Sequence, residues 1–335
     1  MKHVFPRWVR TRVRTFASAA VVLVVVVLSG APVGAGAGTP RWVDDSSAGA
    51  VERIADVGAA ADPLPAQWHD LNGDGRSDLV AREAATGTVY AYPHSGVFNG
   101  AGTYPTRHAV LFGAQALNWI AVSEVTGDFA ADLIARRGDG TLVVYPGSGQ
   151  LQGGSTFGEE VLVGTGWGGV TALSVADVTD DGDQDIVARW GDGSLHVYPH
   201  TGIFDGTNTW ASPELIGTGW NIMDWIGVAE LTSDDSRVDV VGRRAGDSTL
   251  QMYPHNRWYD GTATFVGPVQ VGTGWHSVEI MSLVTVTLDD FTDVVARRST
   301  GELVVYRNAG GYNGDFTFHS PTGLGGGWNT MNLIA

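Results

Sequence analysis

The sequence predicts an all-β protein, a β-propeller of five four-stranded blades. Three observations lead to this fold. Each of five repeats holds four short apolar stretches divided by Gly- and Asp-rich turns, which is the pattern of a propeller blade. The final residues of the chain supply a strand that the first repeat lacks. An acidic nonapeptide recurs about every 54 residues, with its last acid at Asp78, Asp132, Asp185, Asp239 and Asp293.

The first 37 residues have the layout of a secretory signal peptide. Five basic side chains precede an apolar run from Ala17 to Leu28, and small residues follow as far as Ala35 and Ala37, near which we expect cleavage. The apolar run has 12 residues, whereas a membrane-spanning helix needs roughly 20. We therefore expect a secreted, extracellular protein without stable membrane insertion; a retained membrane anchor is the alternative.

Net charge limits the kinds of partner that the protein can bind, and cysteine content limits how its loops can be stabilised. The net charge of −16 becomes −21 once residues 1–37, with five basic and no acidic side chains, are removed. This charge excludes nucleic acid as a partner and suits divalent cations, which neutralise clustered carboxylates. The chain contains no cysteine, so disulfides cannot hold its loops. The loops must therefore be stabilised by interactions other than disulfides. We expect the protein to be a monomer.

The repeats follow a leader without periodicity. Residues 38–66 are rich in Ala, Gly, Ser and Asp and predict a flexible segment. The propeller is expected to fill residues 67–335. The third repeat shows its four strands most clearly, at Val170–Ala176, Ile186–Arg189, Leu195–Tyr198 and Glu214–Ile216.

A second repeated motif contains tryptophan. Gly-Thr-Gly-Trp ends at Trp167, Trp220 and Trp275, Gly-Gly-Gly-Trp ends at Trp328, and we align residues 113–116 of the first repeat with them. A large ring fills the wedge between twisted sheets, so we expect each Trp to pack between blades. A surface that stacks on sugar is the alternative.

The two ends of the repeat region complement each other. In complete repeats the Trp lies ten residues before the acidic loop, as Trp167 does before Asp177. Counted from Trp328, the sequence stops at Ala335, just short of such a loop, whereas the first repeat begins shortly before its own. We therefore expect residues 330–335 to form the innermost strand of the first blade, which closes the ring and removes exposed sheet edges.

The acidic loops predict bound Ca²⁺, which prefers six to eight oxygen ligands. In the first loop, Gly75 permits the turn, and the ligands offered are the side chains of Asp70, Asn72, Asp74 and Asp78 with the carbonyl of Arg76. The third loop offers Asp177, Thr179, Asp181, Asp183 and Asp185. The second is a weaker site with Phe129 in place of the glycine, and it offers Glu124, Thr126, Asp128 and Asp132.

The fourth and fifth loops are expected to have lost the metal. One has an extra residue before its last acid, and the other begins with Thr285. The alternative for every loop is that Asp and Asn only satisfy the backbone of a turn. A helical EF-hand is excluded, because its twelfth position, a Glu, is here Ala81 within a strand-like run.

A loop of this kind that leads into a strand resembles the FG-GAP and VCBS-type repeats, and the resemblance covers residues 67–335. It implies a secreted or surface propeller, as in integrin-like heads, with calcium in the loops and adhesive surfaces on the blades. Two features depart from the family: its propellers commonly have seven blades, and its Phe-Gly signature survives only as Phe112-Gly113. Blade count and Trp/Gly richness also resemble tachylectin-type propeller lectins.

Each repeat carries an arginine four residues after its last loop acid: Arg82, Arg136, Arg189, Arg243 and, likewise, Arg297. Five guanidinium groups can form an anion-binding ring. We favour the alternative that each forms an ion pair with nearby carboxylates, because every one of these arginines follows an Asp-rich loop.

A set of aromatic and histidine residues predicts a carbohydrate surface, because aromatic rings stack on the apolar face of a sugar. The set follows the Tyr-Pro-His motif of the blades and comprises Tyr92, His94, Phe98, Tyr198, His200, Phe204, Tyr253, His255, Trp258, Tyr306 and Tyr312. The alternative is that these side chains cap the outer strands. The histidines lie on different blades, so a shared zinc site is excluded.

These features together predict a secreted, calcium-stabilised module that binds extracellular glycan or a cell-surface protein. The sequence contains no G-x-S-x-G elbow, no H-E-x-x-H helix and no phosphate-binding glycine loop. A hydrolase or lyase that uses the propeller channel is one alternative. A structural accessory module that acts only with another protein is a second.

Overall fold

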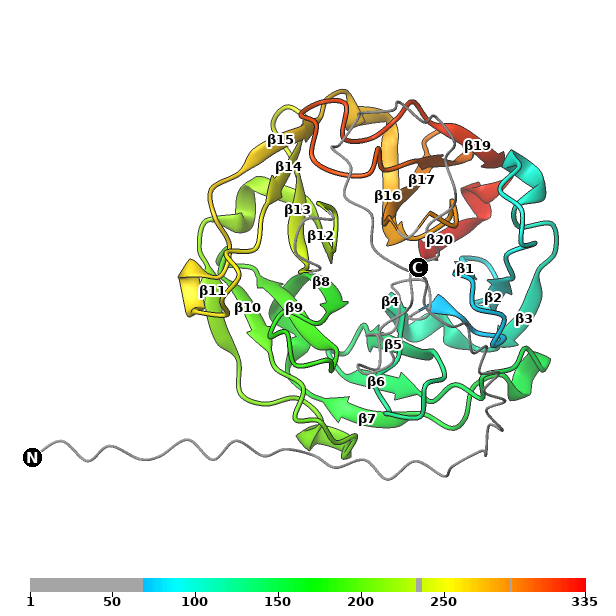
Figure 1. The fold of residues 1–335 in the computed structure, drawn as a ribbon. Coiled ribbons are helices and arrows are strands. Elements are labelled where there is room, and N and C mark those ends of the chain that lie inside the picture. Colours follow the sequence, from blue (N-terminus) through cyan, green and yellow to red (C-terminus); the bar gives the residue numbers. More distant parts are fainter. Residues whose placement is uncertain (1–68, 233–236, 290) are drawn as a thin grey trace, which may run out of the picture. The chain divides into compact units, whose positions relative to one another are not determined.

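The computed structural model describes residues 69–335 except 233–236 and 290, and within them it shows a ring of five blades (Figure 1). The predicted signal peptide and leader lie outside the described residues. Each blade is one antiparallel sheet of four strands. The prediction of a five-bladed, all-β propeller is confirmed.

The strands of a blade follow one another along the chain from the innermost to the outermost, except that blade 1 takes its innermost strand from the C-terminal residues. Blade 1 contains β20 (Met331–Ile334), β1 (Leu79–Glu83), β2 (Val89–Tyr92) and β3 (His108–Leu111). Blade 2 contains β4 (Leu117–Ser123), β5 (Asp132–Arg137), β6 (Leu142–Tyr145) and β7 (Val161–Gly164). Blade 3 contains β8 (Val170–Ala176), β9 (Asp185–Trp190), β10 (Leu195–Tyr198) and β11 (Glu214–Gly217). Blade 4 contains β12 (Met223–Ala229), β13 (Asp239–Arg244), β14 (Leu250–Tyr253) and β15 (Val269–Gly272). Blade 5 contains β16 (Val278–Val284), β17 (Asp293–Arg298), β18 (Leu303–Tyr306) and β19 (Thr322–Gly325).

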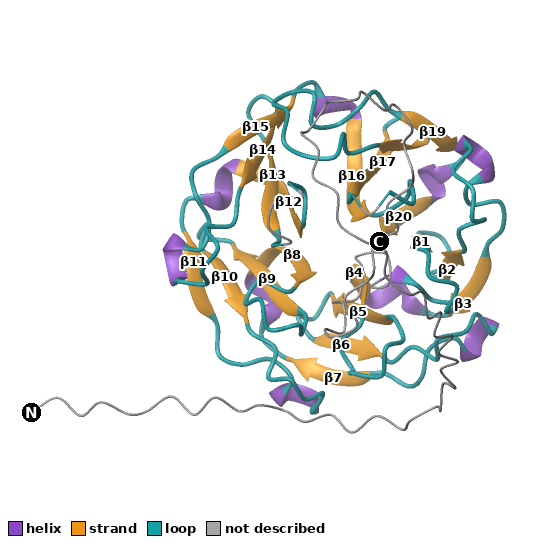
Figure 2. Ribbon diagram, in the orientation of Figure 1, coloured by secondary structure: helices purple, strands orange, loops and turns teal. Residues whose placement is uncertain are grey.

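Three-residue 3-10 turns join these strands, and Figure 2 shows them as the helical elements of the ring. One set precedes the innermost strands: η3 (Ala114–Ala116), η5 (Trp167–Gly169), η7 (Trp220–Ile222), η9 (Trp275–Ser277) and η10 (Trp328–Thr330). The other set precedes outermost strands: η2 (Gly100–Gly102), η4 (Gly153–Ser155), η6 (Gly206–Asn208) and η8 (Gly261–Ala263). Among the described residues, no helix is long and apolar enough to cross a bilayer.

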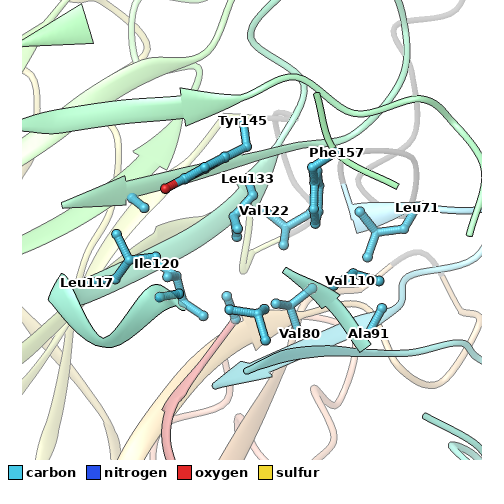
Figure 3. Packing of buried hydrophobic residues seen from close by; sticks show 14 of the residues in the cluster. Leu71, Val80, Ala91, Val110, Leu117, Ile120, Val122, Leu133, Tyr145 and Phe157 are labelled. Atoms are coloured by element: carbon cyan, nitrogen blue, oxygen red, sulfur yellow. The ribbon is translucent and has the colours of Figure 1, made fainter. Parts of the chain in front are cut away.

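The hydrophobic core lies between neighbouring blades. Strands such as β9 are buried along almost their whole length, because each face of the blade packs on an adjacent blade. Figure 3 shows the cluster between blades 1 and 2, where Val80 and Val110 face Leu117 and Leu133. Full burial of an aliphatic side chain contributes about 1.5–3 kcal/mol. Each blade therefore depends on both of its neighbours for its core.

The repeated tryptophans pack between blades, as predicted. Trp167 is buried in a cluster that combines blade 2 and blade 3 side chains. Its equivalents Trp220, Trp275 and Trp328 are also buried. A Cβ added at Gly217 would lie 2.3 Å from the indole nitrogen of Trp220, so the glycine of the motif makes room for the ring.

The alignment of this motif in the first repeat was wrong by two residues. The turn η3 begins at Ala114, as η5 begins at Trp167, and both backbones enter the turn through a left-handed glycine. The equivalent of the Trp is therefore Ala114 and not Ala116. Ala114 also lies ten residues before Glu124, which is the spacing that the other repeats keep.

The ring closes through the C-terminal residues, as predicted. Strand β20 pairs antiparallel with β1, with Ile334 opposite Ala81 and Leu333 opposite Arg82. The amide of Val80 donates to the carbonyl of Ala335 over 2.7 Å. Blade 1 thereby gains its innermost strand from a segment about 250 residues away along the chain.

The repeated arginines join each blade to the next, and the predicted ion pair with a nearby carboxylate forms at Arg243 and at Arg297. Arg82 donates to the carbonyls of Ala114 and Leu117 on blade 2, and Arg243 donates to that of Val278 on blade 5 over 2.6 Å. The others bond the next blade in the same way: Arg136 to Val170, Arg189 to Met223, and Arg297 to Met331. Each arginine lies at the end of its strand away from the acidic loop. The carboxylates that they contact, Asp224 and Glu279, belong to innermost strands.

Replacement of Arg243 by Met should lower the free energy of unfolding by about 2–4 kcal/mol, because it leaves buried carbonyls without a charged donor. Arg244 is the matched control: it is adjacent in sequence, but its side chain is 47% exposed and meets only Asp247 at 3.5 Å. Arg244→Met should cost less than about 1 kcal/mol. Urea unfolding of the two variants measures the difference, and equal costs would contradict the blade-joining role.

Candidate calcium loops and ligand-binding surfaces

The acidic loops and the ends of the third strands lie together on one face of the ring. Each acidic loop precedes the second strand of its blade, and in blades 2 to 5 it connects the innermost strand to the second, as residues 124–131 connect β4 to β5. The third strand runs back and ends beside it: the amide of His94, just after β2, donates to Asp78 Oδ1 over 2.9 Å. We call this side, formed by the acidic loops and the segments that follow the third strands, the acidic-loop face.

The last acid of every loop binds backbone amides inside the blade. Asp185 accepts hydrogen bonds from the amides of Val178, Thr179 and His200, at 2.8–3.0 Å. Its equivalents Asp78, Asp132, Asp239 and Asp293 are buried and bonded in the same way. Burial raises the pKa of Asp78, Asp132 and Asp185 to about 7. This carboxylate therefore anchors the loop even in repeats that lack the other predicted ligands.

In the first loop the predicted ligand side chains turn inward around the backbone. Asp70 accepts the amides of Gly73 at 2.8 Å and Gly75 at 2.7 Å. Asn72 Oδ1 accepts the amide of Asp74 over 2.9 Å. The guanidinium of Arg76 lies 3.2 Å from Asp74 Oδ2, so its side chain partly neutralises the loop. All donors offered are hard oxygens, which is the ligand type that Ca²⁺ prefers.

The third loop adds an unsatisfied polar atom. Asp177 accepts the amides of Asp181 and Gly182, and Asp181 accepts that of Asp183 over 3.0 Å. The hydroxyl oxygen of Thr179, one of the predicted ligands, is buried and has no hydrogen-bond partner in the described structure. Buried polar atoms are almost always bonded, so an unpaired oxygen in a loop rich in carboxylates suits a ligand of a cation. Burial also raises the pKa of Asp177, to about 6.

The second loop keeps the same backbone path without its glycine. Glu124 accepts the amides of Gly127 and Asp128, as the first acid does in the other loops. Phe129 has φ 69°, in the left-handed region that Gly75 and Gly182 occupy in loops one and three. A bulky residue there is strained. Thr126 Oγ1 lies 3.4 Å from Asp132, so both of these predicted ligands also contact each other.

The fourth and fifth loops are described only in part. Residues 233–236 of the fourth and residue 290 of the fifth lie outside the described structure. In the fifth loop, Thr287 contacts Asp293 through its backbone and hydroxyl, and Thr285 replaces the first acid. Across the described parts of the chain, no three His, Asp or Glu side chains converge in the manner of a metal site. Calcium in any loop remains a prediction.

The histidines of the predicted carbohydrate set lie beneath the acidic-loop face and join blades. His200 Nε2 is 3.1 Å from the carbonyl of Val125 on blade 2, and His94 Nε2 is 3.1 Å from that of Val286 on blade 5. His255 contacts Val178 in the same way, and Asn308 takes this position in blade 5. All four are buried. Burial lowers the pKa of His94.

The tyrosines of the set stack on the repeated tryptophans. Tyr92 lies on Trp328 and Tyr198 on Trp167, with ring centroids 4.6 and 4.5 Å apart. Tyr253 and Tyr306 pair with Trp220 and Trp275 in the same way. Phe98 and Phe204 are half-buried against cores between blades. These rings are therefore used mainly in packing between blades, and Tyr198 also lines a groove on blade 3.

Trp258 and Tyr312 are the members of the set that are exposed, at 76% and 51%. Trp258 comes five residues after Tyr253, as Val97 does after Tyr92, so it corresponds to Val97 and not to Phe98. Val97 and its blade 3 equivalent Ile203 are exposed too. Exposed apolar side chains therefore follow the third strands at the acidic-loop face, a feature that the sequence comparison misaligned by one residue.

Comparisons with known proteins give no family. No protein-family model matches the chain, and no curated protein matches it. Part of the chain, 72% in each case, is similar to three solved structures. The Photorhabdus luminescens Tc holotoxin pore is 13% identical with a TM-score of 0.39, human WBSCR16 is 10% identical with 0.30, and BBS1N, solved in complex with ARL6DN, is 14% identical with 0.37. The matched regions span 12%, 64% and 79% of those chains, respectively. The propeller fold is therefore assigned from the strand order of the five sheets of this chain and not from these similarities.

Phe129→Gly should raise the free energy of unfolding by about 1 kcal/mol, because it relieves a left-handed φ at a side chain that is 74% exposed. Phe316 is an equally exposed control without a left-handed φ. Phe316→Gly should leave stability unchanged or lower it, since glycine adds freedom to the unfolded chain. Thermal unfolding compares the two; a destabilised Phe129→Gly variant would contradict the strain.

Proposed function

We propose that this protein is a secreted, calcium-stabilised propeller that binds extracellular glycan through the acidic-loop face. The observation that carries the proposal is the exposed Trp258, which stands on a rigid blade beside Asp260 and the other loop residues. An exposed indole stacks on the apolar face of a sugar ring, and neighbouring polar groups bond its hydroxyls. Exposed Tyr312 offers a second ring on the neighbouring blade 5.

The calcium part of the proposal is supported by the charge and burial of the loops. Buried carboxylates with raised pKa values lie close to further acids, as Asp78 lies close to Asp70 and Asp74. A divalent cation offsets this repulsion and the cost of burial. The unpaired hydroxyl of Thr179 offers a further oxygen. In an exported chain without cysteine, bound metal would supply the stability that disulfides provide elsewhere.

The binding role follows from how the repeated residues are used. The arginines, the histidines and the tryptophans of the repeats make contacts between blades. The side chains left for a partner are those that differ between blades, such as Trp258, Val97 and Ile203. Recognition by loops on a rigid scaffold suits a binding module. A cell-surface protein is the competing partner for the same face.

Calcium should stabilise the fold through the first and third loops. A metal that binds only the folded state, at a hundredfold excess over its Kd, stabilises by about 2.7 kcal/mol per site. Asp74→Ala and Asp181→Ala should each remove part of the rise in melting temperature that calcium gives over chelator. Asp289→Ala, at the same position of the fifth loop, is the control and should retain the whole rise. A parent protein that melts identically with calcium and chelator would refute the metal sites.

Trp258→Ala should weaken binding to glycans on an array by at least about tenfold, the loss of roughly 1.4 kcal/mol of stacking and burial. Phe112→Ala is the control, because Phe112 is 63% exposed but follows the outermost strand at the other end of a blade. Binding to cells that survives removal of their glycans would favour a protein partner and contradict the glycan proposal.

A further inference from the structure

Blade 3 carries an open groove on its outer part, away from the acidic-loop face. The groove has a volume of about 540 Å³ and lies along β9, β10 and the start of β11. Trp190, Tyr198 and Pro213 supply its apolar lining. Asp192, Ser194 and His196 supply its polar lining.

In blade 2 the same position is filled by an ion pair. Arg137 occupies the place of Trp190, and Glu160 occupies the place of Pro213, four residues before the last glycine of the outermost strand. Arg137 bonds Glu160, and the hydroxyl of Tyr145, the equivalent of Tyr198, donates to Glu160 over 2.9 Å. A charged cluster thus covers the strands where blade 3 is open.

Blade 1 has the same arrangement with its charges exchanged. Glu83 stands in the place of Trp190, and Arg107 in that of Pro213. The guanidinium of Arg107 lies over the ring of Tyr90, 4.2 Å from its centroid, and interacts electrostatically with Tyr92 and Glu83. Blades 4 and 5 have Arg244 and Arg298 at the first position. Blade 3 alone among the five places an uncharged aromatic ring there.

Trp190 is held as a fixed platform. A Cβ added at Gly169 would lie 3.0 Å from its ring, so the ring packs against the backbone of the neighbouring turn. Tyr198, which lies on the next strand, lines the groove beside this ring. A preorganised ring loses little entropy when a ligand stacks on it.

His196 carries a polar atom that no described residue satisfies. Its Nδ1 is buried and has no hydrogen-bond partner in the described structure. The equivalent residues are Val143 in blade 2 and Gln251 in blade 4, and the Gln251 amide bonds Thr249 over 3.0 Å. Buried polar atoms are normally paired, and this imidazole, whose Nδ1 lacks a partner, is also part of the lining of the groove.

The polar end of the groove is a tight turn. Asp192 Oδ1 accepts hydrogen bonds from the amide and the hydroxyl of Ser194, at 2.9 and 2.6 Å. The same turn occurs in blade 2 with Asp139 and Thr141, so its shape is structural. The exposed carboxylate of Asp192 places a charged acceptor at the groove.

We infer that this groove binds a neutral hexose residue of a glycan, stacked on Trp190 with its hydroxyls bonded by Asp192, Ser194 and His196. A sugar ring has the apolar face and the several directional hydroxyls that this lining matches. An anionic ligand is disfavoured by Asp192 and by the net charge of −16. The inference rests on the proposed glycan-binding function but on a different surface from Trp258.

The test uses the whole protein and free methyl glycosides of glucose, galactose and mannose as probes, with binding measured by saturation-transfer NMR and tryptophan fluorescence. The parent should bind at least one of them with a Kd in the millimolar range. Trp190→Arg combined with Pro213→Glu installs the residues of blade 2 and should abolish binding. His196→Val, also a blade 2 residue type at this position, should weaken it at least fivefold.

Trp258→Ala serves as the control and should bind the same glycoside as tightly as the parent. If binding survives in both the Trp190→Arg/Pro213→Glu and His196→Val variants, the groove is not the site. If the parent binds none of the three glycosides, the inference is also overturned. The same holds if the groove binds tetramethylammonium, a cation that aromatic rings attract, and none of the glycosides. Loss of array binding in Trp258→Ala with no effect of the blade 3 variants would leave the proposed function intact and refute the groove.

Discussion

The structure depends on polar bonds between neighbouring blades, made by an arginine at all five junctions and by a histidine or asparagine at four of them, because blade 2 has Gly147 at that position. At one end an arginine of each blade donates to the carbonyls of the turn that begins the next blade, as Arg189 does to blade 4. At the other end a histidine or asparagine contacts a carbonyl of the previous blade, as His200 does. Apolar side chains fill the space between and would allow the blades to slide. The two sets of directional bonds restrict this sliding and hold neighbouring blades at a fixed angle.

This arrangement explains why the acidic loops keep their last acid while losing others. Asp293 accepts the amides of Val286 and Asn308, so it ties the loop to the third strand that carries the blade-joining residue. Its removal would disturb the contact between blades as well as the loop. The first acid has only local partners, and its loss at Thr285 disturbs only the loop. The last acid of each loop is therefore explained by its role in the fold, whereas the other acidic positions bear on whether the loop binds a metal.

The sequence was sufficient to predict the strands, the blade number and the closing strand, because these follow from a local pattern that repeats with little variation. It did not predict the partners of the arginines or histidines. Arg82 meets Ala114, and His94 meets Val286, through contacts that depend on how blades are placed around the ring. A histidine beside tyrosine and proline looks the same in sequence whether it faces solvent or a neighbouring carbonyl. The sequence also did not predict the groove of blade 3. This groove is lined by Trp190 and Pro213, which are distant in sequence and come together only in the folded sheet.

The pairing of β20 with β1 has a consequence for how the molecule folds. Most strand pairs in the blades are neighbours along the chain and can form as local hairpins, whereas this pair joins segments about 250 residues apart. Closing so large a loop is slow and opposed by chain entropy. One edge of β1 therefore stays unpaired until the other four blades have folded and placed β20 beside it. During this interval β1 is the place where another chain can add a strand, so aggregation during refolding should begin at the seam.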